Sequence, residues 1–168
     1  MRFDIETERL RFRMPHAGDL DARCAFFDDP VTRSVYERSF TRAEVYHQLE
    51  TDMLQWGTRG YGRWVLEDKQ TGSYAGHAGF IHFDDHDIEI AYALHPAFRG
   101  RGLAIEAAKR VRDFGYGELK FSRLVCYIRP TNHNSIRVAE KLGAAPEGST
   151  MLLGHEHTIY LITNPYLN

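Results

Sequence analysis

A basic segment with two glycines is the part of this sequence best suited to bind an anion. It reads Arg99-Gly100-Arg101-Gly102-Leu103-Ala104. It follows an apolar run that we expect to be a strand, and it opens a run with helical periodicity. Glycine lets backbone N–H groups approach an anion, and the first-turn amides of a helix have no intrahelical partner and lie at its positive end. The segment therefore predicts a cradle for a pyrophosphate.

Other phosphate-binding patterns do not fit this loop. No lysine followed by serine or threonine comes after the second glycine, so the loop lacks the γ-phosphate lysine and the magnesium ligand of an ATPase. The glycines are not spaced as G-x-G-x-x-G, which disfavours a dinucleotide-binding site. The remaining alternative is a loop that only begins a helix.

Histidine is the other residue type that could hold a ligand, with nine copies in 168 residues. His82 and His86 bracket an acidic turn, and His155 and His157 flank Glu156 on an expected strand. Neither pair belongs to a complete ligand set at the spacing of a zinc site. We therefore predict no metal site.

The elements that must position the glycine loop follow from apolar periodicity. We predict strands at 9–14, 63–67, 74–83, 88–94, 124–128, 151–153 and 158–162, with a turn at 84–87. We predict helices at 20–27, 41–56, 103–114 and 135–142. Thr41 and Glu44 form a capping-box pattern, and we expect Gly57 to end that helix. Gly143 predicts a left-handed cap after the last helix.

Composition sets the class of the protein. The chain is 43% hydrophobic and 26% charged, as in ordinary globular proteins, and its element order predicts one mixed α/β (α+β) domain over residues 1–168. Cys24 and Cys126 lack CxxC spacing, so we expect reduced cysteines and a cytoplasmic protein. No apolar run approaches the roughly 20 residues of a membrane span, and the N-terminus carries no apolar signal segment. The net charge of −2 argues against nucleic-acid binding.

Three motifs in this sequence resemble those of one enzyme family. Residues 88–107 resemble the acetyl-CoA-binding core of GNAT acetyltransferases, whose loop pattern is Arg/Gln-x-x-Gly-x-Gly/Ala. Residues 130–135 resemble the P-x-N-x-x-S motif of that family, and residues 136–143 resemble the helix that follows it. Residues 7–13 resemble the opening of its RimJ/RimL branch, which modifies the N-terminal amino groups of ribosomal proteins.

The resemblance extends from about residue 7 to the C-terminal hairpin, and it implies a fold and a co-substrate. The fold is the GNAT fold, with a mixed central sheet of about six to seven strands, flanked by about four helices. The sheet splays at the cofactor site. The implied co-substrate is acetyl-CoA.

The resemblance also implies which residues contact the cofactor. The pantetheine arm would lie in the splay and pair with main-chain groups of Tyr92 and Leu94. The amides of the 99–104 loop would bind the pyrophosphate, Asn132 would reach the pantetheine amides, and Asn134 would also face the cofactor. The alternative for the two asparagines is that they cap a helix.

The implied chemistry is direct attack of an amine on a thioester, for which a base must take the amine's proton. Strand alternation places Glu89 with Ala91 and Ala93 on one face of the strand beside the cofactor gap. Partial burial there can raise the pKa of a carboxylate, as a base requires. Glu89 is therefore our candidate base. The alternative is a strand-surface glutamate paired with a basic side chain.

The leaving thiolate needs a proton or a hydrogen bond. Many GNAT enzymes use a tyrosine on the helix after the asparagine motif, but the aligned residue here is Ala139, which puts a tyrosine acid in doubt. The RimJ/RimL branch can use the serine of its motif, which is Ser135 here. The alternatives are that Ser135 only caps backbone amides and that water supplies the proton.

These patterns predict an N-acetyltransferase that moves the acetyl group of acetyl-CoA to a primary amine in a ternary complex. The acceptor is a protein N-terminal α-amine or a small-molecule amine, and the enzyme is a monomer or a homodimer. We expect no nucleic-acid partner and no membrane partner. The alternative function is a catalytically silent acyl-CoA sensor or regulatory module.

Overall fold

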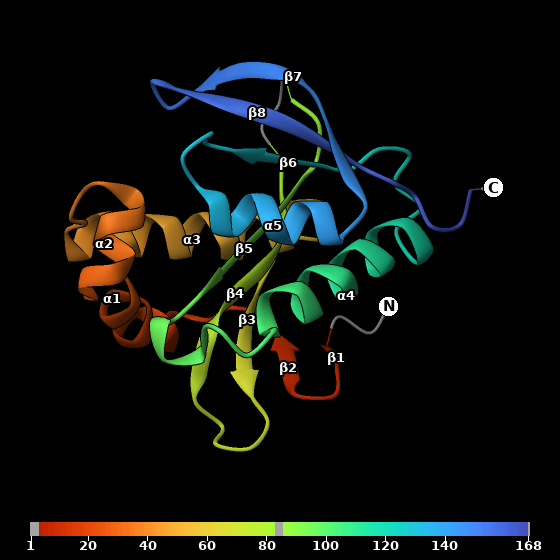
Figure 1. Ribbon diagram of the computed structural model, residues 1–168. Coiled ribbons are helices and arrows are strands. Elements are labelled where there is room, and N and C mark those ends of the chain that lie inside the picture. The colour runs from red at the N-terminus through yellow and green to blue at the C-terminus, as the bar shows by residue number, and fades with distance from the viewer. Residues whose placement is uncertain (1–3, 83–85, 168) are drawn as a thin grey trace.

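A mixed eight-stranded sheet runs through the molecule (Figure 1). The computed structural model describes residues 4–82 and 86–167. The strands are β1 (Ile5–Glu6), β2 (Leu10–Arg13), β3 (Arg63–Asp68), β4 (Tyr74–Ile81), β5 (Glu89–Leu94), β6 (Val125–Ile128), β7 (Ala144–Leu152) and β8 (His155–Ile162). The helices are α1 (Leu20–Asp28), α2 (Pro30–Tyr36), α3 (Arg42–Arg59), α4 (Leu103–Gly117) and α5 (His133–Lys141), with 3₁₀ turns η1 (Ala17–Asp19) and η2 (Pro96–Phe98). The strand order is β1-β2-β3-β4-β5-β6-β8-β7, in which β5 and β6 form the parallel pair.

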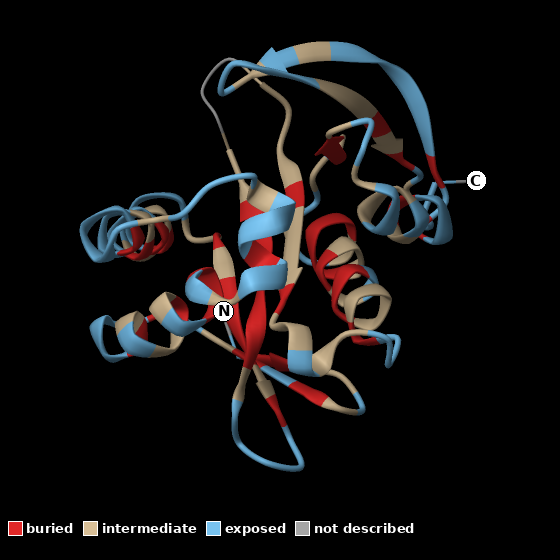
Figure 2. Ribbon diagram, turned by 60° about the vertical axis from the view of Figure 1, so that its left-hand side comes forward, coloured by how far each residue is buried: buried red, intermediate tan, exposed pale blue. Residues whose placement is uncertain are grey.

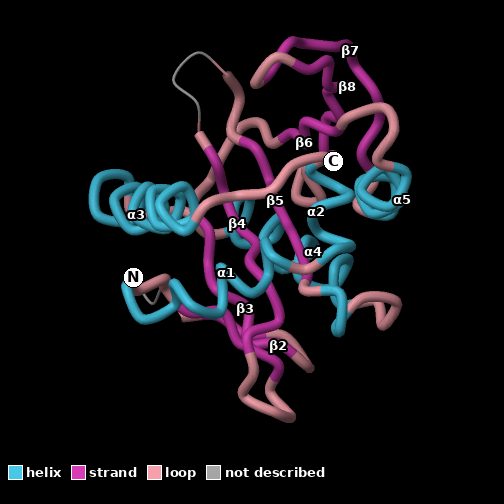
Figure 3. The backbone as a smooth tube through the Cα atoms, turned by 90° about the vertical axis from the view of Figure 1, so that its left-hand side faces the viewer, coloured by secondary structure: helices cyan, strands magenta, loops and turns pink. Residues whose placement is uncertain are grey.

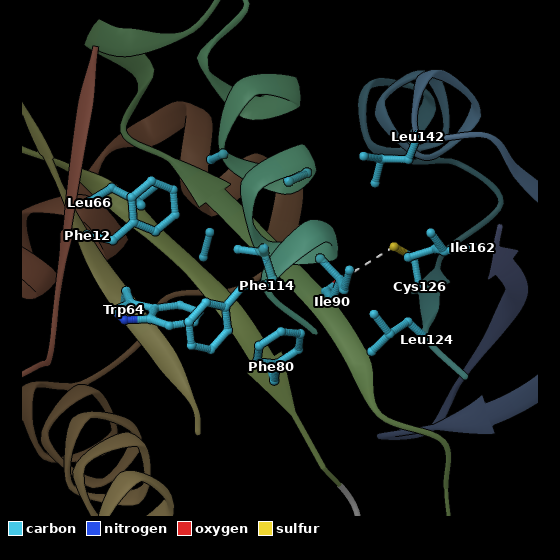
Figure 4. Packing of buried hydrophobic residues seen from close by; sticks show 14 of the residues in the cluster. Phe12, Trp64, Leu66, Phe80, Ile90, Phe114, Leu124, Cys126, Leu142 and Ile162 are labelled. Carbon is cyan, nitrogen blue, oxygen red and sulfur yellow. Dashed lines mark hydrogen bonds between the residues drawn. The ribbon is translucent and has the colours of Figure 1, made fainter. Parts of the chain in front are cut away.

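Helices cover both faces of the sheet (Figure 2). Helix α4 packs against β4 and β5, where Trp64, Phe80 and Phe114 meet at the centre of the larger hydrophobic cluster (Figure 4). Helix α1 packs against α3 and β4, with Phe26 and Phe27 in a smaller second cluster. Helix α5 lies against α4, β6 and β7. The fold class predicted from the sequence, a mixed α+β domain, is confirmed.

Helix α4 shows most clearly why the sequence forms this fold. Leu103, Ala107, Val111 and Phe114 recur at helical spacing and are all fully buried. This stripe holds the helix, and with it the glycine loop at its N-terminus, against the sheet. The burial of about four such side chains stabilises the contact by several kcal/mol.

The predicted helix ends are partly confirmed. Thr41 and Glu44 form the expected capping box at the start of α3. The predicted end at Gly57 is wrong, because α3 continues to Arg59 and ends at Gly60, whose φ of 70° is left-handed. A glycine inside a helix weakens it by only about 1 kcal/mol, whereas a left-handed glycine ends it. Gly143 has a φ of 79° after α5, as predicted.

Two elements were not predicted, so the counts of about six to seven strands and about four helices were too low. The short β1 pairs with β2. Helix α2 begins directly after α1, where Asp29 accepts hydrogen bonds from the amides of Val31 and Thr32, and Pro30 occupies the first turn. An Asp-Pro pair can end one helix and begin the next. Because we interpreted Asp29-Pro30 only as the end of the first helix, we did not predict the start of α2.

The predicted strand boundaries also need correction at three places. Strand β8 begins at His155, three residues before the predicted start at residue 158. Strand β7 runs from Ala144 to Leu152, whereas we expected only residues 151–153. Strand β4 ends at Ile81. Residues 83–85, which belong to the predicted end of this strand and to the predicted turn, lie outside the described residues.

The parallel strands β5 and β6 diverge soon after they meet. Their one paired position is Glu89 with Val125, where the Val125 amide donates to the carbonyl of Ile88 at 3.1 Å. Strand β5 then continues toward α4 while β6 stays beside β8 (Figure 3). One residue farther along β6, the Cys126 thiol donates to the carbonyl of Ile90 on β5 at 3.3 Å (Figure 4). The sheet therefore has the splay that the sequence led us to expect.

Candidate active site

The main-chain groups of alternate β5 residues face the splay. The His95 amide donates to the carbonyl of Ala75 on the side of β4, so the odd-numbered residues of β5 pair with β4. The even-numbered residues Tyr92 and Leu94 therefore present their N–H and C=O groups toward the opening. The carbonyl of Leu94 already accepts the Arg99 Nε at 3.0 Å, which ties the glycine loop to the end of β5.

The glycine loop has the backbone conformation of an anion cradle. Gly100 and Gly102 have φ angles of 74° and 76°, which residues with a side chain rarely adopt. Gly102 is the N-cap of α4, and the first intrahelical bond runs from the Glu106 amide to its carbonyl at 3.2 Å. The amides of Leu103 and Ala104 thus precede the hydrogen-bonded part of the helix and lie at its positive end.

A buttress from the N-terminal segment holds this loop in place. Arg9 donates through Nη1 to the carbonyl of Arg101 at 2.8 Å and through Nε to Glu106 at 2.7 Å. Thr7 donates its hydroxyl to Glu106 at 2.6 Å. Burial alone would raise the pKa of Glu106, but the bonds from Thr7 and Arg9 outweigh it and lower the pKa, so this carboxylate is ionised at neutral pH. Sequence reasoning missed this role, although residues 7–13 stood out as a motif.

A cleft of about 710 Å³ lies between the glycine loop, the end of β5, β6 and α5. Every residue predicted to contact the cofactor lines it except Arg101. The lining includes Tyr92, Leu94, Arg99, Gly100, Gly102, Leu103, Ala104, Asn132 and Asn134. The Arg101 guanidinium lies instead 5.8 Å from the centre of the Phe98 ring. Residues of α1, α2 and the β7–β8 hairpin also line the cleft, so distant parts of the chain assemble it.

A second cleft, of about 790 Å³, opens on the side of α3 and contains Glu89. The two clefts share Tyr92, Asn132 and Ser135 among their lining residues. Because these residues line both clefts, a molecule in one can meet a molecule in the other there. Glu89 lies in the second cleft, which the glycine loop does not line. This is where a base that acts on a second substrate would lie.

Glu89 is partly buried, and burial raises its pKa to about 7. The charge of Arg63 and the Tyr127 amide oppose this shift without cancelling it. A carboxyl group with this pKa can both accept and release a proton near neutral pH.

The start of α5 connects the splay to the second cleft. The Asn132 side-chain oxygen accepts the Ser135 amide at 3.2 Å, so Asn132 caps this helix. The cap uses only the oxygen, and the side-chain NH₂ group can still donate to a ligand. The Tyr92 hydroxyl donates to the carbonyl of Ser135 at 2.9 Å, and burial raises its pKa, so it stays protonated. Ala139 is fully buried and supplies no acid.

Residues 9–145 match the acetyltransferase (GNAT) domain family. The chain belongs to the GNAT acetyltransferase family. YkkB of Bacillus subtilis is 32% identical to this GNAT chain over 150 residues, 83% of each protein. The spermidine N(1)-acetyltransferase of Escherichia coli K12 is 32% identical over 166 residues, 98% of this chain and 79% of that one. Membership in the GNAT family makes the protein an acetyl-CoA-dependent N-acetyltransferase.

Solved GNAT structures confirm the fold. An acetyltransferase from Agrobacterium tumefaciens strain C58 superimposes with a TM-score of 0.86 at 25% identity, covering 97% of this chain and 95% of that one. RimL, an N-terminal acetyltransferase of ribosomal L7/L12 seen with coenzyme A, superimposes with a TM-score of 0.76 at 18% identity, covering 96% and 98%. At that identity the likeness concerns the fold alone.

The described residues form no cluster for a metal ion and no helix that could span a membrane. In residues 4–82 and 86–167, no three His, Cys, Asp or Glu side chains gather closely enough to bind a metal ion. Within the same ranges, none of the GNAT helices is long and apolar enough to span a membrane. Both cysteines are free thiols.

Proposed function

We propose that this GNAT enzyme acetylates a small primary amine, which binds in the second cleft while acetyl-CoA occupies the first. The observation that carries this proposal is the placement of Glu89, a carboxyl with a pKa of about 7, in the cleft that meets the cofactor cleft at Ser135. The likeness to a spermidine acetyltransferase over 98% of this chain supports a small-molecule amine. A protein N-terminal amine is the other acceptor that the motif at residues 7–13 suggests.

The glycine loop fits the pyrophosphate of acetyl-CoA. Its two left-handed glycines and the free first-turn amides of α4 form a cradle that an additional side chain at Gly102 would strain. Tyr92 and Leu94 offer main-chain groups to the pantetheine arm along β5, and Asn132 and Asn134 face it from α5. When bound, acetyl-CoA supplies a thioester whose carbonyl carbon accepts a nucleophile.

The residues of the second cleft supply the proton chemistry. Glu89 takes a proton from the ammonium group of the acceptor, directly or through one water, and the neutral amine attacks the thioester carbonyl. The C–N bond forms, the C–S bond breaks, the thiolate leaves, and the nitrogen gives its second proton to water, which makes the product a neutral amide. Ser135 donates a hydrogen bond or a proton to this thiolate and regains its proton from water. Glu89 then releases its proton to solvent, which returns the site to its starting state.

The motif at residues 7–13 does not decide between the two acceptors. Thr7 and Arg9 hold the loop and the first turn of α4, a role that serves the cofactor whatever the acceptor is. A silent sensor would not need a carboxyl group with a shifted pKa in the second cleft, which is why we favour the enzyme.

The test is release of CoA from acetyl-CoA in the presence of a panel of primary amines. We expect Glu89→Gln to lower kcat/KM by about a hundredfold or more without weakening acetyl-CoA binding. For the wild type, kcat/KM should rise with pH around an apparent pKa of about 7, and this limb should disappear in the variant. Glu140→Gln, an exposed change on α5, is the matched control. Unchanged turnover in Glu89→Gln would contradict the role of Glu89.

A further inference from the structure

A buried ion triad lies under the second cleft, next to Glu89. Asp52 on α3 accepts Arg23 Nη1 at 2.6 Å with one oxygen and Arg63 Nε at 2.8 Å with the other. The exposed fractions of the side chains are 1% for Arg23, 5% for Asp52 and 16% for Arg63. Two guanidinium groups thus share one carboxylate in a region of low water content. An unbalanced positive charge in such a place is costly unless another anion contacts it.

The donors of this triad are not all used. Arg23 Nε and Nη2 are buried without a hydrogen-bond partner in the described part of the chain. Arg63 bonds Asp52 through Nε, and Arg63 and Asp52 both line the second cleft. The two terminal nitrogens of Arg63 have no hydrogen-bond partner among the described residues and can bind a ligand in the cleft. A guanidinium fits a carboxylate through two parallel N–H bonds.

Strand register places Arg63 and Glu89 on the same face of the sheet. Arg63 of β3 is opposite Gly79 of β4, which is opposite Ala91 of β5, and Ala91 is two residues from Glu89. Two strand spacings, about 10 Å, separate the two backbones, and the side chains cover part of that span. Gly79 carries no side chain between them, and one cannot be added, because a Cβ there would lie 2.2 Å from the carbonyl of Gly62.

The other arginine and carboxylate side chains among the described residues that line the cleft are paired. Arg38 forms an ion pair with Glu44, and Arg129 forms one with Glu37 at 3.2 Å. Among the described residues, the cleft therefore offers one carboxylate that can accept an ammonium group, Glu89, and one guanidinium with free donors. That pair matches a zwitterion. A polyamine carries two or more ammonium groups and would find only one such carboxylate in residues 4–82 and 86–167.

We propose that the acceptor is a small amino acid-like amine, whose carboxylate is bound by Arg63 while its amino group lies at Glu89. This inference rests on the proposed function and narrows its substrate class. The carboxylate balances the second guanidinium of the triad, and the ammonium group enters beside Glu89, which then removes its proton. Arg63 is a specificity-determining residue in this scheme.

The experiment compares amines that differ only in the carboxylate. Glycine, leucine, phenylalanine, β-alanine and 4-aminobutyrate are each assayed against the corresponding carboxamide, with spermidine and a tripeptide alongside, by CoA release. We expect at least one amino acid to exceed its carboxamide tenfold in kcat/KM. In Arg63→Gln this ratio should fall to about one, chiefly through KM, and Arg63→Lys should keep part of it. Arg38→Gln, a change at an arginine already paired with Glu44, should preserve the ratio.

Several outcomes would overturn the inference. Equal or better use of the carboxamides or of spermidine by the wild type would show that no carboxylate is recognised, while leaving acetyl transfer intact. Equal or better use of the tripeptide would show that the acceptor is not amino acid-sized. If the enzyme acetylates aminomethylphosphonate, the phosphonate analogue of glycine, as well as it acetylates the preferred amino acid, the site recognises an anion in general and not a carboxylate. If no amine releases CoA, the proposed function fails. Calorimetric titration of the CoA-saturated protein with the same pairs then tests the Arg63 site by itself. The wild-type comparison does not depend on whether the Arg63 variants fold.

Discussion

Glu89 combines two environments that push its pKa in opposite directions. Partial burial disfavours the carboxylate, and the nearby charge of Arg63 favours it, with burial the stronger effect. Strand alternation was enough to place Glu89 on the correct face, because side-chain direction in a strand depends only on a period of two. The nearby charge of Arg63, which is itself bonded to Asp52, could not be predicted, since Arg63 is on β3 and Asp52 is on a helix, both far from Glu89 in the sequence.

The raised pKa of Glu89 has a consequence for stability. In the folded protein this carboxyl releases its proton at about pH 7, above its ordinary value of 4.5. Its contribution to stability is therefore fully present below about pH 4.5 and is lost as the pH rises through 7. We expect Glu89→Gln to become more stable relative to wild type between pH 5 and pH 8, by up to about 3 kcal/mol. Urea unfolding at both pH values measures this, and a difference that does not change with pH would contradict the pKa shift.

At the scale of elements, the glycine loop works because other segments hold it. Its own sequence predicted the strand, the loop and the helix, since each is specified by neighbouring residues. The N-terminal buttress was not predicted, because Thr7 and Arg9 reach Glu106 from almost a hundred residues away. Helix α2 was missed for a local reason, because Asp29-Pro30 both ends α1 and begins α2. The last residue of α2, Tyr36, lines both clefts.

The buttress yields a prediction that separates binding from folding. Arg9→Ala removes the bonds to Glu106 and to the Arg101 carbonyl, so the loop loses its support. We expect acetyl-CoA affinity to fall at least fivefold, while the free energy of unfolding falls by only about 1 kcal/mol because Arg9 is partly exposed. Calorimetric titration and urea unfolding measure the two effects. Arg11→Ala, a change at an exposed arginine two residues away, should alter neither. Equal affinity in Arg9→Ala would show that the loop needs no buttress.

At the scale of the whole molecule, the splayed sheet places the two clefts on different sides of β5. The cofactor cleft lies on the side of α4 and α5, and the second cleft lies on the side of α3, with Tyr92 and Ser135 where they meet. The residues predicted for the cofactor side lie in local motifs, and all of them except Arg101 line the first cleft. The acceptor side is built from residues of α2, α3, β3, β5 and the β7–β8 hairpin. Its chemistry appears only once the fold brings them together.

The most direct test of this account is a thermal unfolding titration with acetyl-CoA, CoA and ATP on the wild type and on Gly102→Glu. Acetyl-CoA and CoA at about a hundred times their dissociation constants should each stabilise the wild type by roughly 2.7 kcal/mol, with ATP far weaker. Gly102→Glu strains a left-handed position and puts a carboxylate in the cradle, so this stabilisation should vanish. Gly72→Glu, at a left-handed glycine in the β3–β4 turn, should keep it. If the folded wild type gains no stability from either CoA species, or if Gly102→Glu responds as the wild type does, the cradle assigned here is wrong.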